Sequence, residues 1–242
     1  MIEIKDVHKS FGKKVVLDGV TTTIEDKKTT VFIGPSGCGK STILKIILRL
    51  IEPDTGEIIV NNEDVSKFKP KKLDAFRAKT GMVFQAAALF DSLSIWENVG
   101  FALLERENMS RDAVRKIASE KLTAVGLEGS EDLFPSELSG GMQKRAAIAR
   151  AIAQDPEMIF YDEPTTGLDP ITSTVIEELM KKIQVDMGIT SVIVTHQHST
   201  IFNNADIITM FHKGRIYASG VPDEFKNASD ELVRNFIEGK VS

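Results

Sequence analysis

Hydrophobic residues follow two different periods along this chain, and each period predicts a different kind of element. Residues 1–7 alternate apolar and polar side chains, residues 14–20 do so less regularly, and the turn-like KSFGKK lies between them. These segments predict an antiparallel hairpin. Residues 29–33 are a short apolar run, which is typical of a buried parallel strand. Helical spacing then predicts a helix that ends near residues 53–56 and has as its apolar positions Ile43, Ile46, Ile47, Leu50 and Ile51.

Strand-like and helix-like segments alternate over the rest of the chain. Further strands are predicted at residues 57–60, 81–84, 158–161, 190–195, 207–211 and 215–219. Further helices are predicted at residues 70–78, 95–104, 111–125, 139–153 and 170–185. Residues 86–135 show helical patterns without a strand, which is typical of an inserted helical subdomain. The alternation elsewhere predicts an α/β fold with a mainly parallel sheet.

Composition narrows the class of protein. The chain has 242 residues, 42% of them hydrophobic, and a formal net charge of −5, which argues against a nucleic-acid partner. A single cysteine excludes an internal disulfide and a cysteine-rich zinc site. Residues 1–9 lack the apolar core of a secretory signal, and no apolar run reaches the roughly 18 residues of a membrane span. The sequence therefore predicts a soluble, cytoplasmic protein.

Residues 31–42, VFIGPSGCGKST, contain the Gly-x-x-x-x-Gly-Lys-Ser spacing of a phosphate-binding P-loop. Glycines let successive backbone N–H groups turn inward onto phosphate oxygens, and the following helix adds the positive end of its dipole. We expect Lys40 to reach the β- and γ-phosphates and Ser41 to ligate Mg²⁺. The predicted nucleotide cradle consists of Gly34, Pro35, Ser36, Gly37, Cys38, Gly39, Lys40, Ser41 and Thr42.

Cys38 occupies the start of that predicted helix, where the dipole could lower the pKa of its thiol. We expect it nevertheless to be a small residue that the loop tolerates, without a catalytic role.

Two adjacent carboxylates, Asp162 and Glu163, end the apolar strand near residue 161. A carboxylate at the end of a strand beside a P-loop is where a Mg²⁺ ligand belongs. Side chains alternate along a strand, so the two should point in different directions. We expect Asp162 to hold the magnesium shell and Glu163 to orient the attacking water.

The segment LSGGMQ, residues 138–143, opens another helix with a serine and two glycines. Ser139 can cap this helix, while backbone N–H groups and the helix dipole remain available to an anion. We expect the nucleotide contacts of this segment to come from Ser139, Gly140, Gly141 and Gln143.

Together, GPSGCGKST, LSGGMQ, IFYDEP, TTGLDP and VTH resemble the nucleotide-binding subunit of ABC transporters, over essentially the whole chain. The resemblance implies a P-loop NTPase (RecA-like) fold with an antiparallel β subdomain and a helical subdomain, and ATP and Mg²⁺ as cofactors. It also implies that Phe11 stacks on adenine, that Gln85 contacts Mg²⁺ and the attacking water, and that Asp169 is the D-loop aspartate. His196 matches the histidine that contacts the γ-phosphate. The residue after it is Gln197, where the family usually carries an acid, and Phe11 stands where tyrosine is commoner.

The same resemblance implies how the chain is organised. Residues 1–85 and 156–220 would form the catalytic core with its β subdomain, residues 86–155 the helical subdomain, and residues 221–242 a C-terminal helical tail. Two copies would pair head to tail, with each ATP held between one P-loop and the partner's LSGG. The expected partners are multi-span membrane permease subunits, which would place the chain on the cytoplasmic face of the inner membrane.

Residues 86–105, AAALFDSLSIWENVGFALLE, bear on the transported substrate. They resemble the ATP-binding subunits of phospholipid transporters with mammalian-cell-entry (lipid-asymmetry) partners, as residues 221–239 also do. This resemblance implies a phospholipid cargo and a lipid-binding subunit of the mammalian-cell-entry type. The alternative is the ATPase subunit of a polar amino-acid importer, whose chain has a similar length.

Two further classes have P-loops. A GTPase switch would carry an Asn-Lys-x-Asp motif, which this sequence lacks. A non-transport ABC ATPase acting on ribosomes or DNA would usually carry two cassettes or a coiled-coil insertion, and the sequence has neither. Transport therefore remains the preferred interpretation.

Overall fold

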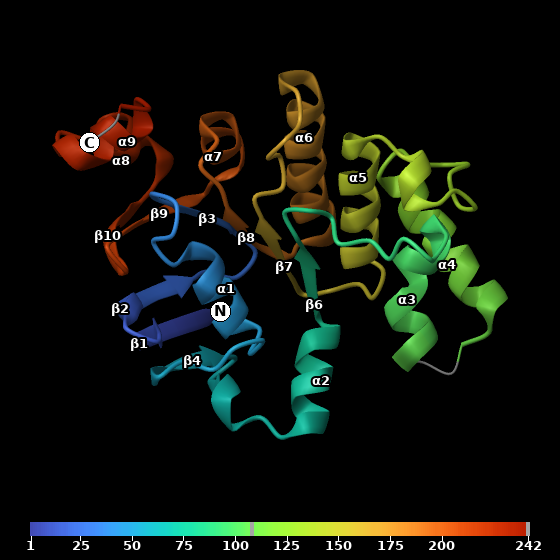
Figure 1. Cartoon of the computed structure of the whole chain (residues 1–242), viewed down its shortest axis with the longest axis horizontal. Helices are drawn as coiled ribbons and strands as arrows, with labels where there is room; N and C mark the ends of the chain where they lie inside the picture. The colour runs from blue at the N-terminus through green and yellow to red at the C-terminus, as the bar shows by residue number, and fades with distance from the viewer. Residues whose placement is uncertain (107–108, 241–242) are drawn as a thin grey trace. The chain divides into compact units, whose positions relative to one another are not determined.

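The computed structural model describes residues 1–106 and 109–240 (Figure 1). The chain divides into two compact units. Unit 1 comprises Met1–Arg77 together with Thr190–Ser242, and unit 2 comprises Ala78–Ile189. Of the helices that are described, none is both long and apolar enough to cross a membrane.

An antiparallel sheet opens unit 1. Its strands lie in the order β2-β1-β4-β5. β1 pairs with β2 from Ile2 opposite Ile24 to Phe11 opposite Lys14, which confirms the predicted hairpin. The alternating apolar side chains of β1 are buried at Ile2 and Ile4. The strands are β1 (Ile2–Phe11), β2 (Lys14–Ile24), β4 (Thr55–Val60) and β5 (Glu63–Asp64).

A second group of strands in unit 1 is parallel at its centre. β3 (Thr29–Ile33) pairs in parallel with β8 (Thr190–Val194) and with β9 (Ile207–His212), and β10 (Arg215–Gly220) returns antiparallel to β9. All five residues of β3 and of β8 are buried, as a continuous apolar run predicts for a central parallel strand.

The helices of unit 1 begin and end close to the predicted positions, with two exceptions. The first helix ends at Ile47, so the prediction that it continues through Leu50 and Ile51 is wrong. Arg49 has a φ of 50°, which is left-handed, and Leu50 is exposed. The short helix α7 was not predicted, because its seven residues are too few to show a clear helical period. These helices are α1 (Lys40–Ile47), α2 (Pro70–Ala78, whose last residue begins unit 2), α7 (His198–Asn204), α8 (Pro222–Lys226) and α9 (Glu231–Ile237), with a 3-10 turn at Val65–Lys67.

The part of unit 2 that the structure describes combines two parallel strands with four α-helices. β6 (Thr80–Val83) pairs with β7 (Met158–Asp162), with Val83 opposite Tyr161. Helices α3, α4 and α5 contact one another and gather into one group in Figure 1, with α5 also against β6 and α6. A Cβ at Gly81 would lie 2.6 Å from the Ala151 carbonyl oxygen, so β6 and α5 approach as closely as glycine allows. The helices are α3 (Ile95–Arg106), α4 (Arg111–Ala124), α5 (Gly140–Ala151) and α6 (Pro170–Met187), with a 3-10 turn at Pro135–Glu137.

Candidate nucleotide site

The P-loop of unit 1 runs from the end of β3 into α1, as predicted. Gly34, Gly37 and Gly39 have φ values of 137°, 76° and 108°, a region that side chains rarely adopt. A Cβ at Gly34 would clash with the Phe211 carbonyl oxygen, and one at Gly39 would clash with Leu17. The fold of unit 1 therefore requires glycine at both ends of the loop.

Helix α1 begins without a side-chain cap, because its N-cap residue is Gly39. The Lys40 side chain is buried, and its ammonium donates hydrogen bonds to the carbonyls of Gly34 at 2.7 Å and Pro35 at 3.0 Å. Ser41 and Thr42 lie half-buried in the first helical turn. The uncapped N–H groups, the helix dipole and a lysine inside the loop together suit a phosphate group.

Cys38 is also buried in this loop. Burial raises the pKa of its thiol, and this effect outweighs the opposing influence of the Lys40 ammonium. The pKa of this thiol is therefore raised overall, not lowered as its place at the start of the helix allows. A protonated, enclosed thiol fits the prediction that Cys38 has no catalytic role.

The predicted γ-phosphate sensor, His196, belongs to the same edge of the sheet as the P-loop. β3 and β8 are parallel, with Phe32 opposite Val194. Gly34 and His196 each follow that pair by two residues, so they leave the sheet on neighbouring strands. His196 is exposed, and the backbone N–H of Gln197 donates to the Thr195 hydroxyl at 3.0 Å as α7 begins.

The predicted adenine-stacking residue, Phe11, ends β1 and is exposed. The Lys9 ammonium lies 5.6 Å from the centre of its ring, within the range of a cation–π contact. The exposed ring of Phe11 has a face that can stack on a base.

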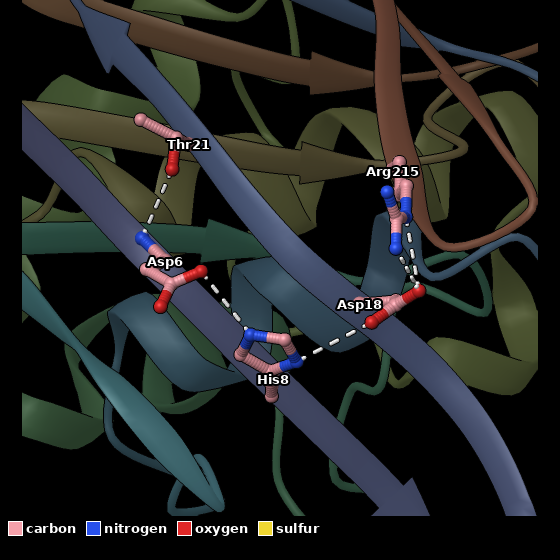
Figure 2. A network of polar contacts seen from close by, with 5 residues as sticks. All are labelled: Asp6, His8, Asp18, Thr21 and Arg215. Carbon is pink, nitrogen blue, oxygen red and sulfur yellow. Dashed lines mark hydrogen bonds and ion pairs between the residues drawn. The ribbon is translucent and has the colours of Figure 1, made fainter.

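A polar network joins the hairpin to β10 (Figure 2). His8 lies between two carboxylates, with Nε2 3.1 Å from Asp6 and Nδ1 3.5 Å from Asp18. Arg215 donates two hydrogen bonds to one oxygen of Asp18, at 2.9 and 2.7 Å. The Asp18 N–H also donates to the Gly214 carbonyl at 2.8 Å. Because Asp18 follows Leu17, the residue packed on Gly39, this network fixes one wall of the P-loop.

The predicted catalytic residues of unit 2 follow two neighbouring strand ends. Gln85 lies two residues beyond Val83 of β6, and Glu163 lies two residues beyond Tyr161 of β7. Asp162 is the last residue of β7, and both carboxylates are half-buried. Glu163 has a φ of 50°, and its carboxylate accepts a hydrogen bond from the Thr166 hydroxyl at 3.1 Å. The structure thus brings Gln85, Asp162 and Glu163 to one edge of the β6–β7 pair.

Two cations of α5 contact these loops, and the sequence analysis did not single them out. The buried Lys144 ammonium donates to the Gln85 carbonyl at 2.5 Å and to the Glu163 carbonyl at 3.4 Å. Arg150 donates to the carbonyls of Ala87 at 2.7 Å and Ala88 at 2.6 Å. Burial lowers the pKa of Lys144, while the Glu163 and Asp162 charges oppose that shift.

The signature segment, residues 138–143, leads into α5. The Ser139 hydroxyl accepts a hydrogen bond from the Met142 N–H at 3.3 Å, which confirms it as the cap. Ser139 and Gly140 are exposed, whereas Gly141 is buried. The Gln143 amide donates to the Pro135 carbonyl at 2.9 Å, so it also supports the turn before the helix.

Asp169 caps α6, close to the signature segment. It accepts hydrogen bonds from the Thr172 hydroxyl at 2.6 Å and the Thr172 N–H at 3.0 Å. These bonds hold the pKa of the Asp169 carboxyl below its usual value. A Cβ at Gly141 would lie 2.5 Å from Thr172 Cγ2. Thr172 therefore connects the predicted D-loop aspartate to the signature glycine.

The donor set fits Mg²⁺ better than a transition metal. Among the described residues no group of three or more His, Cys, Asp or Glu side chains could hold a metal ion. Each of the predicted ligands Ser41, Gln85 and Asp162 would coordinate a metal through a side-chain oxygen. Mg²⁺ prefers oxygen and is usually held by one or two protein groups together with substrate phosphates.

A glycine-rich loop between a parallel strand and a helix, with two carboxylates after another parallel strand, defines a P-loop nucleotide hydrolase. Residues 17–166 match the ABC transporter family, so the chain belongs to that family. It is an ATPase cassette, and the family and fold predicted from the motifs are confirmed.

Relatives match over nearly the whole chain. The chloroplastic protein TRIGALACTOSYLDIACYLGLYCEROL 3 of Arabidopsis thaliana is 43% identical, with 100% of this chain and 74% of the relative covered. The intermembrane phospholipid transport system ATP-binding protein MlaF of Haemophilus influenzae is 38% identical over 99% of this chain and 91% of its own. A dimeric ATP-binding cassette in a post-hydrolysis state, bound to ADP and Pi, has a TM-score of 0.83 at 35% identity, covering 91% of this chain and 98% of that structure.

Proposed function

We propose that this chain is the ATP-hydrolysing subunit of an ABC transporter for phospholipid. The observation that supports a phospholipid cargo most directly is the 38% identity to MlaF over 99% of this chain. That match includes residues 86–105 and 221–239, which carry the resemblance to phospholipid transporters. A polar amino-acid importer remains the competing assignment.

The proposed chemistry is in-line attack of water on the γ-phosphate. Lys40 and the first N–H groups of α1 hold phosphate oxygens, and Phe11 stacks on adenine. Glu163 orients and deprotonates the water, Gln85 positions it, and His196 contacts the γ-phosphate. Ser41, Asp162 and Gln85 would hold Mg²⁺, which would neutralise phosphate charge when bound.

We propose further that two copies pair head to tail on ATP. A single P-loop supplies too few hydrogen-bond donors for the charge of the triphosphate. The exposed N-terminus of α5 offers further N–H donors. Ser139, Gly140, Gly141 and Gln143 would then serve the nucleotide of the partner, with Asp169 nearby. ATP would link the two copies, and hydrolysis would release them.

The proposed partners are multi-span permease subunits and a lipid-binding subunit of the mammalian-cell-entry type. The chain would bind them at the cytoplasmic face of the inner membrane. The group of helices α3, α4 and α5 would transmit the change between the closed and the open dimer to the permease subunits.

Purification of the native complex from membranes, followed by mass spectrometry of proteins and lipids, tests this proposal. We expect a multi-span membrane protein and bound phospholipid, with ATPase activity that is lost in Lys40→Ala. Bound amino acids or a periplasmic amino-acid receptor would contradict the lipid assignment but leave the ATPase assignment intact. Nucleotide-dependent, salt-sensitive binding to RNA or DNA would contradict transport altogether.

A further inference from the structure

Helix α5 touches both loops that carry the proposed water-handling residues, and the proposed reaction assigns no role to this contact. The loops are the Q-loop segment, residues 85–88, and the turn at Glu163. They follow β6 and β7 at equivalent positions of a parallel pair, because Val83 lies opposite Tyr161. Their main chains are therefore neighbours at one edge of unit 2.

Both loops adopt backbone conformations that side chains disfavour. Ala87, Ala88 and Glu163 have φ values of 60°, 52° and 50°. Left-handed residues other than glycine are costly and persist only where their surroundings hold them. Within the Q-loop segment, the N–H of Ala88 bonds back to the Ala86 carbonyl at 2.6 Å, a tight local turn.

Lys144 and Arg150 of α5 hold the two loops in these conformations. Lys144 is buried, and an ammonium group is rarely buried without partners. Its partners are the carbonyls of Gln85 and Glu163, one in each loop, with the Asp162 and Glu163 charges nearby. Arg150, six residues further along α5, binds the carbonyls of the two strained alanines.

We propose that Lys144 is a positioning residue, through which helix α5 fixes the positions of Gln85 and Glu163 relative to each other. Lys144 directly follows the signature segment, so a displacement of the start of α5 moves the ammonium that holds both loops. A nucleotide bound to the signature segment of one copy would thus adjust the water-handling residues of that same copy. This inference rests on the proposed ATPase function and adds a coupling between the two active sites of a dimer.

Three variants of the full chain test it. Lys144→Met removes the donors at similar length, Lys144→Arg retains donors and charge, and Arg145→Met is the matched control. Arg145 belongs to the same helix and also binds loop carbonyls, those of Val125 at 3.2 Å and Gly126 at 2.6 Å, away from the strand ends.

We expect Lys144→Met to lower kcat at least about tenfold while KM for ATP changes less than about threefold, because a misplaced water costs turnover more than binding. Lys144→Arg should restore a substantial part of kcat, and Arg145→Met should keep the unaltered rate. Equal turnover of Lys144→Met and the unaltered chain would overturn the proposal, as would an equal loss in Arg145→Met.

Hydrogen exchange gives a readout that does not need activity. Backbone amides of residues 85–88 should exchange faster in Lys144→Met and at the unaltered rate in Arg145→Met. Unchanged exchange in Lys144→Met would overturn the inference even if the proposed ATPase function stood. If the unaltered chain hydrolysed no ATP, faster exchange in Lys144→Met would still support the contact, and the proposed function would be contradicted instead.

Discussion

The two helix starts expected to meet nucleotide phosphate are built differently. α1 begins at a loop whose glycines have left-handed φ, and whose buried end residues Gly34 and Gly39 lie against Phe211 and Leu17 of their own unit. α5 begins with an ordinary serine cap, and Gly140 is exposed on the surface. Among the described residues, a Cβ at Gly140 would meet only Leu168 Cδ2, at 3.6 Å, an ordinary contact. The fold thus requires the P-loop glycines but does not require Gly140. We infer that Gly140 is small because the phosphate of a nucleotide held by a second copy approaches it.

The largest effect should come from Glu163→Gln, which tests whether the two helix starts meet across a dimer. We expect ATP binding to persist while hydrolysis falls at least about a hundredfold, since amide cannot accept the proton of the attacking water. Size-exclusion chromatography with ATP should show a trapped dimer. Glu157→Gln is the control, because Glu157 lies before the same strand and pairs with Lys79 at the surface. Near-normal turnover in Glu163→Gln would mean that another group is the base.

Gly39→Ala should damage the fold itself. The substitution forces a side chain into a φ of 108° and against Leu17, so we expect a loss of about 2 kcal/mol or more in unfolding free energy. Urea titration measures this. Gly37→Ala separates strain from collision, because Gly37 is also left-handed, at φ 76°, but a Cβ there would meet no atom of the described residues within 4 Å. A smaller loss of about 1 kcal/mol is expected for it, and equal losses would contradict the role of Leu17.

Gly140→Ala should reverse that pattern. Its stability should equal or exceed that of the unaltered chain by up to about 1 kcal/mol, because alanine favours helix. We nevertheless expect ATPase activity and ATP-dependent dimerisation to fall at least about tenfold, since the added methyl would stand where a partner's phosphate approaches. Unimpaired dimerisation would remove the argument that Gly140 serves a second copy.

The smallest effect is expected for Cys38→Ser. A buried thiol whose pKa is raised is not a nucleophile, and a hydroxyl is of similar size. Steady-state ATPase activity should stay within about threefold of the unaltered chain. Complete loss would show that the thiol has a function the P-loop geometry does not reveal.

The sequence predicts most elements well because their signals are local. The hairpin follows from alternation, β3 from an apolar run, and the start of α1 from the glycine spacing. The end of α1 could not be read, because neither Gly nor Pro stands at Arg49, where the backbone turns left-handed. Ser139 was identifiable as a cap because capping depends on neighbours in sequence.

Lys144 and Arg150 could not be identified in the same way. In the sequence they are polar positions of a helix after a known motif. Their roles depend on carbonyls 59 and 63 residues away, which are brought near because α5 packs on β6. A backbone carbonyl leaves no trace in residue identity. Ala87 and Ala88 do not give a local signal either, because alanine as a residue type does not indicate a left-handed backbone.

The Arg215–Asp18 link has a consequence for the order in which the protein is made. Its partners are separated by 197 positions in the chain, and the carbonyl that backs Gly34 belongs to Phe211. During synthesis from the N-terminus, unit 2 is therefore complete as a continuous stretch before β9 and β10 emerge to close the P-loop. A growing chain would hold its phosphate cradle unfinished until β9 and β10 are translated, and would bind nucleotide only after unit 2 has had time to fold.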